Sequence, residues 1–170
     1  MEPLTSERDV SGFHSQYRDF DIFLKKKAKE FQDRGISKTF LITEKATNKI
    51  CAYFSIMPGS FTVHREGKLA DVPECVSRIG TIHVYYLASD DDFESEYCHI
   101  VKYIINSVRN IVLVHLREFL SVHYISLDAD YEGGNSSIEE IYKNAGFTEM
   151  HSEEDYNCMI LDLYSTSAFS

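Results

Sequence analysis

The sequence lacks long apolar runs and paired cysteines, and each absence excludes a class of protein. No stretch approaches the roughly 18 consecutive apolar residues of a membrane-spanning helix, so we expect no membrane partner. The cysteines show no C-x-x-C spacing, which argues against a zinc site and against a disulfide framework. They are Cys51, Cys75, Cys98 and Cys158. Because residues 1–10 are polar and acidic, unlike a signal peptide, the expected location is the reducing cytoplasm.

Basic residues are also scarce. Lysine and arginine number 17 against 27 aspartate and glutamate residues, which gives a net charge of −10. A surface that binds nucleic acid normally carries a basic stripe to neutralise phosphates. One basic cluster is present, formed by Lys25, Lys26, Lys27 and Lys29, and it fits the solvated face of an amphipathic helix. We therefore do not expect nucleic acid as a tight partner.

Three common enzyme signatures are missing as well. The sequence contains no Gly-x-Ser-x-Gly, no P-loop and no dinucleotide-binding glycine fingerprint. What it does contain is 170 residues, of which 44% are hydrophobic, enough to build a proper core. We predict a single domain that covers residues 1–170.

Hydrophobic periodicity predicts that helices and strands alternate. Helical spacing of apolar residues is found in residues 19–32, in about 100–120 and in 136–144. Runs rich in aromatic and β-branched residues predict strands over 38–43, 49–57, 79–87, 122–129 and 158–163. Pro58-Gly59 is expected to end the second strand, and residues 61–77 are expected to form an irregular loop. The order predicts an α/β fold.

The run Asn135-Ser-Ser-Ile-Glu-Glu-Ile-Tyr-Lys-Asn-Ala-Gly-Phe147 contains the most specific pattern. Its start offers a capping box, with Ser136 or Ser137 followed three residues later by a glutamate. Gly146 suits the left-handed position that follows a helix. Apolar residues lie on one helical face, at Ile138, Ile141, Tyr142 and Ala145. On these grounds alone, Tyr142 is a packing residue of a capped surface helix.

The spacing of this run resembles the acyl-CoA-binding core of the GNAT N-acetyltransferase superfamily. That pattern has an Asn, a Tyr seven residues later, a Gly four further on, and then Phe. Asn135, Tyr142, Gly146 and Phe147 match it. The resemblance implies the GNAT fold, a central mixed sheet flanked by helices, with acetyl-CoA as co-substrate. It further implies that Asn135 contacts the pantetheine arm and that Tyr142 protonates the departing thiolate.

The front half resembles one branch of this family, the toxin-type acetyltransferases of bacterial toxin–antitoxin pairs. The shared features are Phe13, Phe23-Leu24, Ala28, Gln32, Gly35-Ile-Ser37, Thr39 and a strand over residues 50–60 that ends in Gly-Ser. The resemblance covers about residues 13–150. It implies transfer of an acetyl or short acyl group to an amine, which attacks the thioester directly. The acceptor, a small molecule or a protein, is left open, as is a homodimer or a protein partner.

The strand over residues 79–87 borders the acyl site in GNAT enzymes. The resemblance implies that backbone groups near Ile82 and Val84 orient the thioester and polarise its carbonyl. His83 between them is a candidate base for the acceptor amine, directly or through water, and its alternative is a cross-strand packing role. Asp128 and Asp130 precede a Gly pair; two carboxylates there suggest a metal, but a turn explains them.

One departure from the family pattern is serious. GNAT enzymes place a basic, Gly-rich turn before the long helix, where backbone N–H groups hold the CoA pyrophosphate. Residues 87–98 have no Gly, Lys or Arg. Five carboxylates, Asp90, Asp91, Asp92, Glu94 and Glu96, crowd this helix start instead and are expected to repel a pyrophosphate. The alternative function is therefore a catalytically inactive GNAT-fold protein that binds a protein partner.

Overall fold

The computed structural model describes residues 1–62, 75–129, 136–150 and 158–164. Within these residues, seven strands form a sheet in the order β1-β2-β3-β4-β5-β7-β6. The chain divides into two compact units, Met1–Met57 with Val84–Ile104, and Pro58–His83 with Ile105–Ser170. Strands β3 (Ile50–Thr62) and β4 (Arg78–Ser89) contribute residues to both units. We describe each unit by itself.

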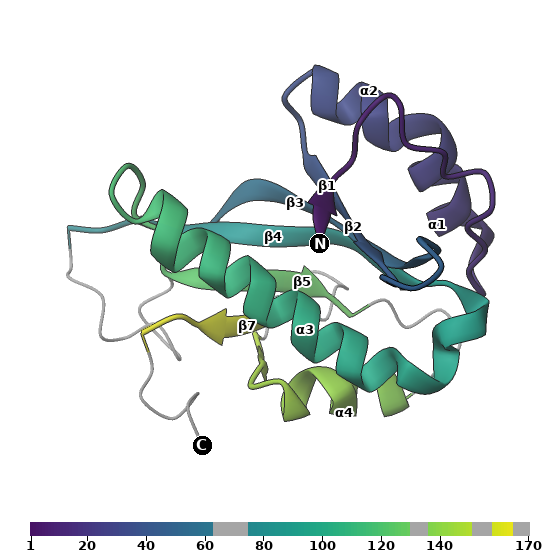
Figure 1. Ribbon diagram of the computed structural model, residues 1–170. Helices are drawn as coiled ribbons and strands as arrows, with labels where there is room; N and C mark the ends of the chain where they lie inside the picture. Colours follow the sequence, from purple (N-terminus) through teal and green to yellow (C-terminus); the bar gives the residue numbers. More distant parts are fainter. Residues whose placement is uncertain (63–74, 130–135, 151–157, 165–170) are drawn as a thin grey trace. The chain divides into compact units, whose positions relative to one another are not determined.

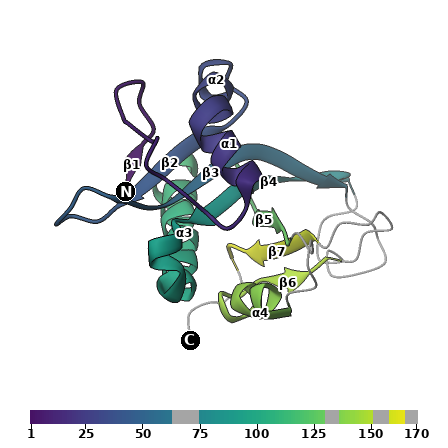
Figure 2. The same ribbon diagram turned by 90° about the vertical axis from the view of Figure 1, so that its right-hand side faces the viewer.

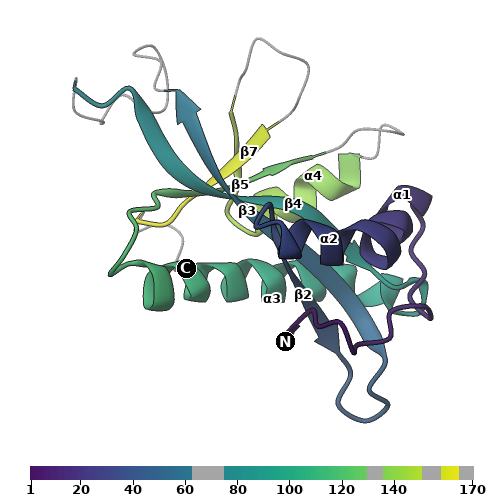
Figure 3. The same cartoon turned by 90° about the horizontal axis from the view of Figure 1, so that it is seen from above.

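A helical segment covers one face of the strands in the first unit. It consists of α1 (Arg18–Ile22), a π-helical turn η1 (Phe23–Lys27) and α2 (Ala28–Asp33). Figures 1, 2 and 3 agree in placing this segment over β2 (Lys38–Thr43) and the first half of β3. Its first turn carries two aspartates, which favour the positive end of the helix dipole. A left-handed Gly35, with φ of 69°, follows its end, as the sequence predicts.

The lysine cluster lies on this segment and is mostly solvated. Lys26 and Lys27 are exposed, whereas Lys25 and Lys29 are half-buried. Lys25 pairs with Asp21 at 3.4 Å, and Lys29 pairs with Asp33. Both are i,i+4 pairs of the kind that stabilise helices modestly. The predicted solvated face is therefore confirmed.

The short strand β1 (Glu2–Pro3) and β2 build the antiparallel edge of the first unit. Glu2 is opposite Leu41, and Leu41 is opposite Tyr53 of β3. The sequence does not predict β1, because two residues cannot establish a period. The bounds of β2 agree with the predicted strand over residues 38–43. The turn that follows contains Asn48 at a φ of 59°, a conformation that Asn tolerates better than most residues.

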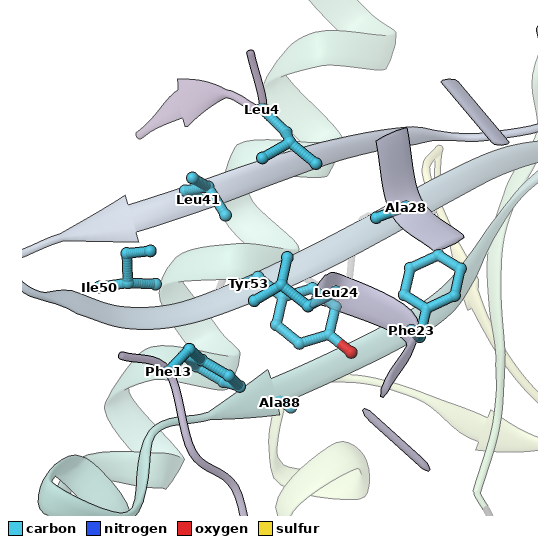
Figure 4. Packing of buried hydrophobic residues seen from close by; sticks show 9 residues of the cluster. All are labelled: Leu4, Phe13, Phe23, Leu24, Ala28, Leu41, Ile50, Tyr53 and Ala88. Atoms are coloured by element: carbon cyan, nitrogen blue, oxygen red, sulfur yellow. The ribbon is translucent and has the colours of Figure 1, made fainter. Parts of the chain in front are cut away.

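The core of the first unit is built around aromatic rings from the helical segment and the sheet. Figure 4 shows side chains of β2, β3 and η1 meeting there, among them Leu41, Tyr53 and Phe23. Phe23 stacks on Tyr86 with ring centroids 3.8 Å apart and meets Tyr53 at 6.3 Å. The Tyr53 hydroxyl donates to the Phe20 carbonyl at 2.9 Å, so its burial leaves no polar group unsatisfied.

The strand β3 continues past the predicted stop. It runs through Pro58-Gly59 to Thr62, so the expectation that this pair ends the strand is wrong. Gly59 has a packing reason instead: a Cβ there would lie 2.6 Å from the Thr81 Oγ1 of β4. A glycine inside a strand often marks such a close approach of two segments.

The second unit contains β5 (Tyr124–Asp128), β7 (Cys158–Asp162), the two-residue β6 (Thr148–Glu149) and α4 (Ser136–Asn144). The strand β7 pairs antiparallel with both β5 and β6. The views agree that α4 lies beside β5 and β7 (Figures 1, 2 and 3). The bounds of α4 are those predicted from its apolar face.

The long helix predicted over about residues 100–120 is made of three parts. A 3-10 helix η2 (Asp91–Glu96) leads into α3 (Tyr97–Asn110), and a π-helical turn η3 (Ile111–Leu116) follows. The first turns of α3, residues 97–104, belong to the first unit and lie on the face opposite the helical segment α1–α2 (Figures 1 and 2). The acidic run is thus the start of this helix.

Replacing Phe23 by Ala should destabilise the fold by about 3–5 kcal/mol, because the ring is 1% exposed and its removal leaves a cavity between four aromatic neighbours. Phe119→Ala is the matched control, since that ring is 85% exposed; its effect should stay within about 0.5 kcal/mol. Urea unfolding measures both. Equal effects from the two substitutions would contradict the assigned core.

Candidate functional site

A polar cluster in the second unit joins three neighbouring strands. His83 of β4 lies 3.1 Å from the Ser126 Oγ through Nδ1 and 3.6 Å from an Asp128 oxygen through Nε2. The Cys158 thiol of β7 lies close enough to the same Asp128 carboxylate for that charge to raise its pKa. Asp128 and Cys158 are directly opposite each other across the β5–β7 pair. We call these four residues the His83 cluster.

The His83 cluster lies on the face of β5 and β7 away from α4. Alternate residues of a strand point to opposite faces, so Ser126 and Asp128 share one face. Leu127 and Ile125 point the other way and are buried. A Cβ placed on Gly146, just after α4, would lie 3.1 Å from the Leu161 side chain. Leu161 is opposite Ile125 in the β5–β7 pair. The helix therefore covers the apolar face and leaves the cluster on the opposite one.

Burial decides the protonation of the two titratable groups beside Asp128. Burial lowers the pKa of His83 below its ordinary value, and the Asp128 charge offsets this only in part. Burial also raises the pKa of the Cys158 thiol to about 12, with a further contribution from the Asp128 charge. At neutral pH both groups are therefore neutral. Cys158 is a hydrogen-bond donor in this state and a poor nucleophile.

The neighbours of the neutral His83 ring favour one tautomer. Nδ1 is hydrogen-bonded to the Ser126 hydroxyl at 3.1 Å, whereas the 3.6 Å between Nε2 and the Asp128 oxygen is too long for a hydrogen bond. The nearby carboxylate favours a proton on Nε2, which leaves Nδ1 to accept from Ser126. Ser126 is 1% exposed, whereas the Asp128 side chain is 49% exposed. The solvent-accessible acceptor of the cluster is therefore the Asp128 carboxylate.

Tyr142 lies on α4, away from the His83 cluster. It is 6% exposed, and its ring centroid is 6.0 Å from that of Phe147. The Phe147 N–H donates to the Tyr142 carbonyl and the Gly146 N–H to the Lys143 carbonyl, while Gly146 has a φ of 96°. These bonds form a Schellman motif, and the Tyr142–Phe147 contact is its usual hydrophobic partner. The predicted left-handed Gly146 is confirmed.

The other predicted cofactor contacts are partly described. Ile82 and Val84 are buried residues of β4, each 4% exposed. Just beyond them, Tyr85 and Tyr86 both contact Phe23, and their own rings are 4.7 Å apart. Consecutive residues of a regular strand point to opposite faces, so β4 is locally irregular there. Asn135 lies outside the described residues, as do Asp130 and the side chains of both predicted capping serines.

The acidic segment at the start of α3 has a structural role. Asp90 is 3% exposed and is the N-cap of η2, accepting from the Asp92 N–H at 3.3 Å. Its other oxygen accepts from the His14 N–H at 3.0 Å, and Lys49 lies 2.9 Å away. Lys49 also pairs with Asp92 and lies over the Phe93 ring. One lysine thus balances two of the five carboxylates.

Four successive backbone N–H groups at this helix start already have acceptors within the chain. Asp90 donates to the Cys51 carbonyl and Asp91 to the His14 carbonyl, each at 2.8 Å. The Asp92 N–H donates to the Asp90 side chain, and the Phe93 N–H to the Asp90 carbonyl. The resemblance places the diphosphate contacts of GNAT enzymes at this helix start. In this chain those N–H groups are occupied by the Cys51 and His14 carbonyls and by Asp90.

A surface hollow of about 370 Å³ lies beside this anchor, lined by residues that include Arg8, Phe13 and Lys49. It contains none of the His83 cluster and not Tyr142, so it is not where the predicted chemistry is found. Among residues 1–62, 75–129, 136–150 and 158–164, no group of three acidic, histidine or cysteine side chains is placed to hold a metal ion. In those same residues no helix is long and apolar enough to cross a membrane.

Solved structures of bacterial toxins share this fold. AtaT complexed with acetyl-methionyl-tRNAfMet aligns over 95% of this chain and 92% of its own, with a TM-score of 0.74 and 17% identity. A Tyr-to-Phe mutant of AtaT, bound to the C-terminus of the antitoxin AtaR and acetyl-CoA, aligns over 95% of this chain and 91% of its own, with a TM-score of 0.68 and 16% identity. A Tyr-to-Phe mutant of KacT aligns over 91% of this chain and 88% of its own, with a TM-score of 0.70 and 15% identity. No family model and no curated protein matches the sequence.

These alignments establish the GNAT fold that the sequence predicts, with its mixed seven-stranded sheet. At 15–17% identity they establish the fold and not the activity. The prediction that nucleic acid is not a partner is partly at odds with them, because AtaT was solved with a tRNA. Because one protein of this fold was solved with a tRNA, the fold does not exclude a nucleic-acid partner, and a net charge of −10 does not exclude one by itself.

The Asp90 anchor should contribute a pH-dependent part of the stability. Burial alone would raise the pKa of Asp90, but the His14 and Asp92 N–H groups and Lys49 outweigh it and hold it below its usual range. A carboxyl whose pKa is lower in the folded state stabilises above its unfolded value and loses this contribution as the pH falls. Asp90→Asn should therefore cost about 2 kcal/mol at neutral pH and less near pH 3.5.

The control is Asp91→Asn, an exposed neighbour on the same turn, which should change the unfolding free energy by less than about 0.5 kcal/mol. Urea midpoints for the three proteins at both pH values make the comparison. A loss of equal size at both pH values would show that the Asp90 charge is not what stabilises the anchor.

Proposed function

We propose that this protein is an N-acyltransferase that moves an acetyl or short acyl group from acyl-CoA to an amine. The observation that carries the proposal is the combination of the GNAT fold with α4 and its Asn-to-Phe spacing. Support comes from a neighbour of the same fold that was solved with acetyl-CoA. The location of the protein, expected to be cytoplasmic, is part of the same proposal.

The proposed reaction is a direct transfer in a ternary complex. The lone pair of the neutral amine attacks the thioester carbonyl carbon, the C–N bond forms, and the C–S bond breaks. The Tyr142 hydroxyl gives its proton to the departing thiolate, and backbone groups near Ile82 and Val84 polarise the carbonyl. Asn135 holds the pantetheine arm. These assignments follow from the resemblance of the sequence to the family.

The amine must also lose a proton, and His83 is the proposed acceptor, through water, because its cluster lies on the sheet face opposite the helix that carries Tyr142. Its lowered pKa keeps the ring neutral, which is the form that a base requires. The lone pair is on Nδ1, facing Ser126. Proton transfer to the ring therefore requires the Ser126 hydroxyl to turn away or to relay the proton.

The acyl donor is proposed to bind through its pantetheine arm more than through its diphosphate. The N–H groups of residues 90–93 are engaged within the chain and cannot also serve phosphate oxygens without breaking the anchor. Asp91 and Glu96 are exposed there and add unfavourable charge. The alternative function, an inactive GNAT-fold protein that binds a protein partner, is favoured by the same segment.

Tyr142→Phe should lower the maximal rate by about 10²-fold or more while leaving acetyl-CoA binding nearly unchanged, because the ring still packs on Phe147. Release of the CoA thiol in the presence of a panel of primary amines measures the rate. Tyr164→Phe, on a half-exposed ring, is the control and should behave as the unmodified protein. An undiminished rate in Tyr142→Phe removes this residue from the mechanism.

Acetyl-CoA and S-acetylpantetheine, which lacks the diphosphate, should both raise the melting temperature, as ligands that bind only the folded state must. The Asp91→Asn, Glu96→Gln double variant removes two exposed charges without touching Asp90. It should bind acetyl-CoA about tenfold more tightly and S-acetylpantetheine no differently.

Three other results of this comparison between acetyl-CoA and S-acetylpantetheine would contradict the expected one. A large preference of the unmodified protein for acetyl-CoA, unaffected by the double variant, would mean that the diphosphate is held elsewhere. Binding of S-acetylpantetheine alone would exclude CoA as the donor. If neither thioester raises the melting temperature, the inactive protein-binding alternative replaces the acyltransferase proposal.

A further inference from the structure

Residues 14–16 are hydrogen-bonded both to the turn at the start of η2 and to the first turn of α1, and we call them the strap. The first residue of the strap makes two backbone bonds to the turn. The His14 N–H donates to the Asp90 carboxylate at 3.0 Å, and the His14 carbonyl accepts from the Asp91 N–H at 2.8 Å. The strap, the turn and α1 all belong to the first unit.

The rest of the strap is bonded to α1 and to the side chains of η2. The Ser15 N–H and the Ser15 hydroxyl both donate to one oxygen of Asp21, at 2.9 and 2.8 Å. The Gln16 amide donates to the Glu94 carboxylate. Because these bonds come from consecutive residues, moving the start of the strap away from the turn also displaces Ser15. The bonds at the two ends are therefore expected to open together, as one cooperative unit.

Opening of the strap leaves both of its carboxylate partners with another donor. Asp90 keeps the ammonium group of Lys49 at 2.9 Å. Asp21 keeps that of Lys25 at 3.4 Å. The His14 side chain is 69% exposed, so the backbone groups released from the turn can bond to water. Stranded buried charges are what makes such an opening costly, and here each charge retains a partner, so the strap can open without unfolding of the unit.

The strap occupies one of the four N–H groups of residues 90–93. The Asp90 N–H donates to the Cys51 carbonyl of β3, and the Asp92 and Phe93 N–H groups both donate to Asp90 itself. The Asp91 N–H differs from these, because its acceptor belongs to the exposed connecting segment. It is the donor that can be released without disturbing β3 or the cap.

We propose that the strap is an autoinhibitory contact, which opens as a unit and thereby exposes the Asp91 N–H to the phosphate groups of acyl-CoA. This inference rests on the proposed acyltransferase function and adds the regulation of its donor binding. The apparent affinity of a ligand that binds only the open form is reduced by the fraction of the protein that is open. S-acetylpantetheine, which lacks the phosphate groups, does not depend on this opening.

Hydrogen exchange of single amides, followed by NMR without any thioester, tests whether the strap opens as a unit. In the unmodified protein the Asp91 amide should exchange faster than that of Tyr53, a fully buried residue of β3, because local opening is easier than unfolding. Ser15→Ala removes a bond at the far end of the strap, to Asp21, and should speed exchange at Asp91 about fivefold. Ser11→Ala, on an exposed serine upstream of the strap, is the control and should leave the Asp91 amide unchanged.

The affinities of the two thioesters test whether the strap controls the donor. Ser15→Ala should bind acetyl-CoA about fivefold more tightly, because the open fraction rises by the same factor as the exchange rate. Its affinity for S-acetylpantetheine should equal that of the unmodified protein. Ser11→Ala should change neither affinity.

The strap is rejected as an opening unit if Asp91 exchanges only together with Tyr53, or if Ser15→Ala leaves the exchange of Asp91 unchanged. Faster exchange with an unchanged affinity for acetyl-CoA would overturn the proposed control of the donor. Because hydrogen exchange needs no thioester, faster exchange in Ser15→Ala together with failure of both thioesters to bind would retain the opening of the strap and reject the transferase.

Discussion

The buried carboxylate of Asp90 is the constraint on which the region proposed to bind the acyl donor depends. A carboxylate taken out of water must be met by donors, and here the His14 and Asp92 N–H groups and Lys49 supply them. In return, the His14 carbonyl accepts from the next residue of the turn. The N-terminal segment, the start of β3 and the start of α3 are thereby joined at one residue of the first unit.

This anchor has a chemical consequence for any acyl-CoA that binds. The family that the sequence resembles uses backbone N–H groups at this helix start to bind the diphosphate of CoA. An N–H group that already donates to an acceptor within the chain cannot also donate to a ligand. Lys49 balances two of the five carboxylates, Asp90 and Asp92. The repulsion of a diphosphate is therefore smaller than five charges would give. The loss of free N–H donors is the more serious departure from the family.

The acceptor side depends on a different arrangement, the His83 cluster of the second unit. For His83 the sequence leaves two roles open, a base or a packing residue, and the proposed base role stays a prediction. Its Nδ1 is hydrogen-bonded to Ser126 and its Nε2 lies 3.6 Å from an Asp128 oxygen, so the ring lies between a buried hydroxyl and an accessible carboxylate. The sequence explains Asp128 as a turn residue. In the structure, Asp128 is the group of this cluster that reaches solvent.

Much of the fold was predictable because local patterns determine it. The bounds of β2 and α4 follow from alternation and from the 3.6-residue period, and Gly35 and Gly146 are left-handed where the sequence places helix ends. The continuation of β3 was not predictable, because Gly59 is explained by Thr81, a residue of another strand. The partners of Asp90 and Asp128 were hidden for the same reason, since His14, Lys49 and Cys158 are far away in sequence.

The acidic turn illustrates how composition and position differ as information. The sequence shows five carboxylates in seven residues, and from composition alone each one repels a phosphate. The structure separates Asp90, a buried cap with defined donors, from exposed neighbours such as Asp91. Burial depends on the packing of the N-terminal segment against this turn, which no local pattern encodes.

The central claim, that this fold transfers an acyl group to an amine, is tested most directly by mass spectrometry of a reaction between the purified protein, acetyl-CoA and a cell extract that contains both small molecules and proteins. The account predicts at least one amine that gains the mass of a single acetyl group, with release of the CoA thiol, only when the protein is present. An extract in which no component is acetylated, although acetyl-CoA binds the protein, would contradict it.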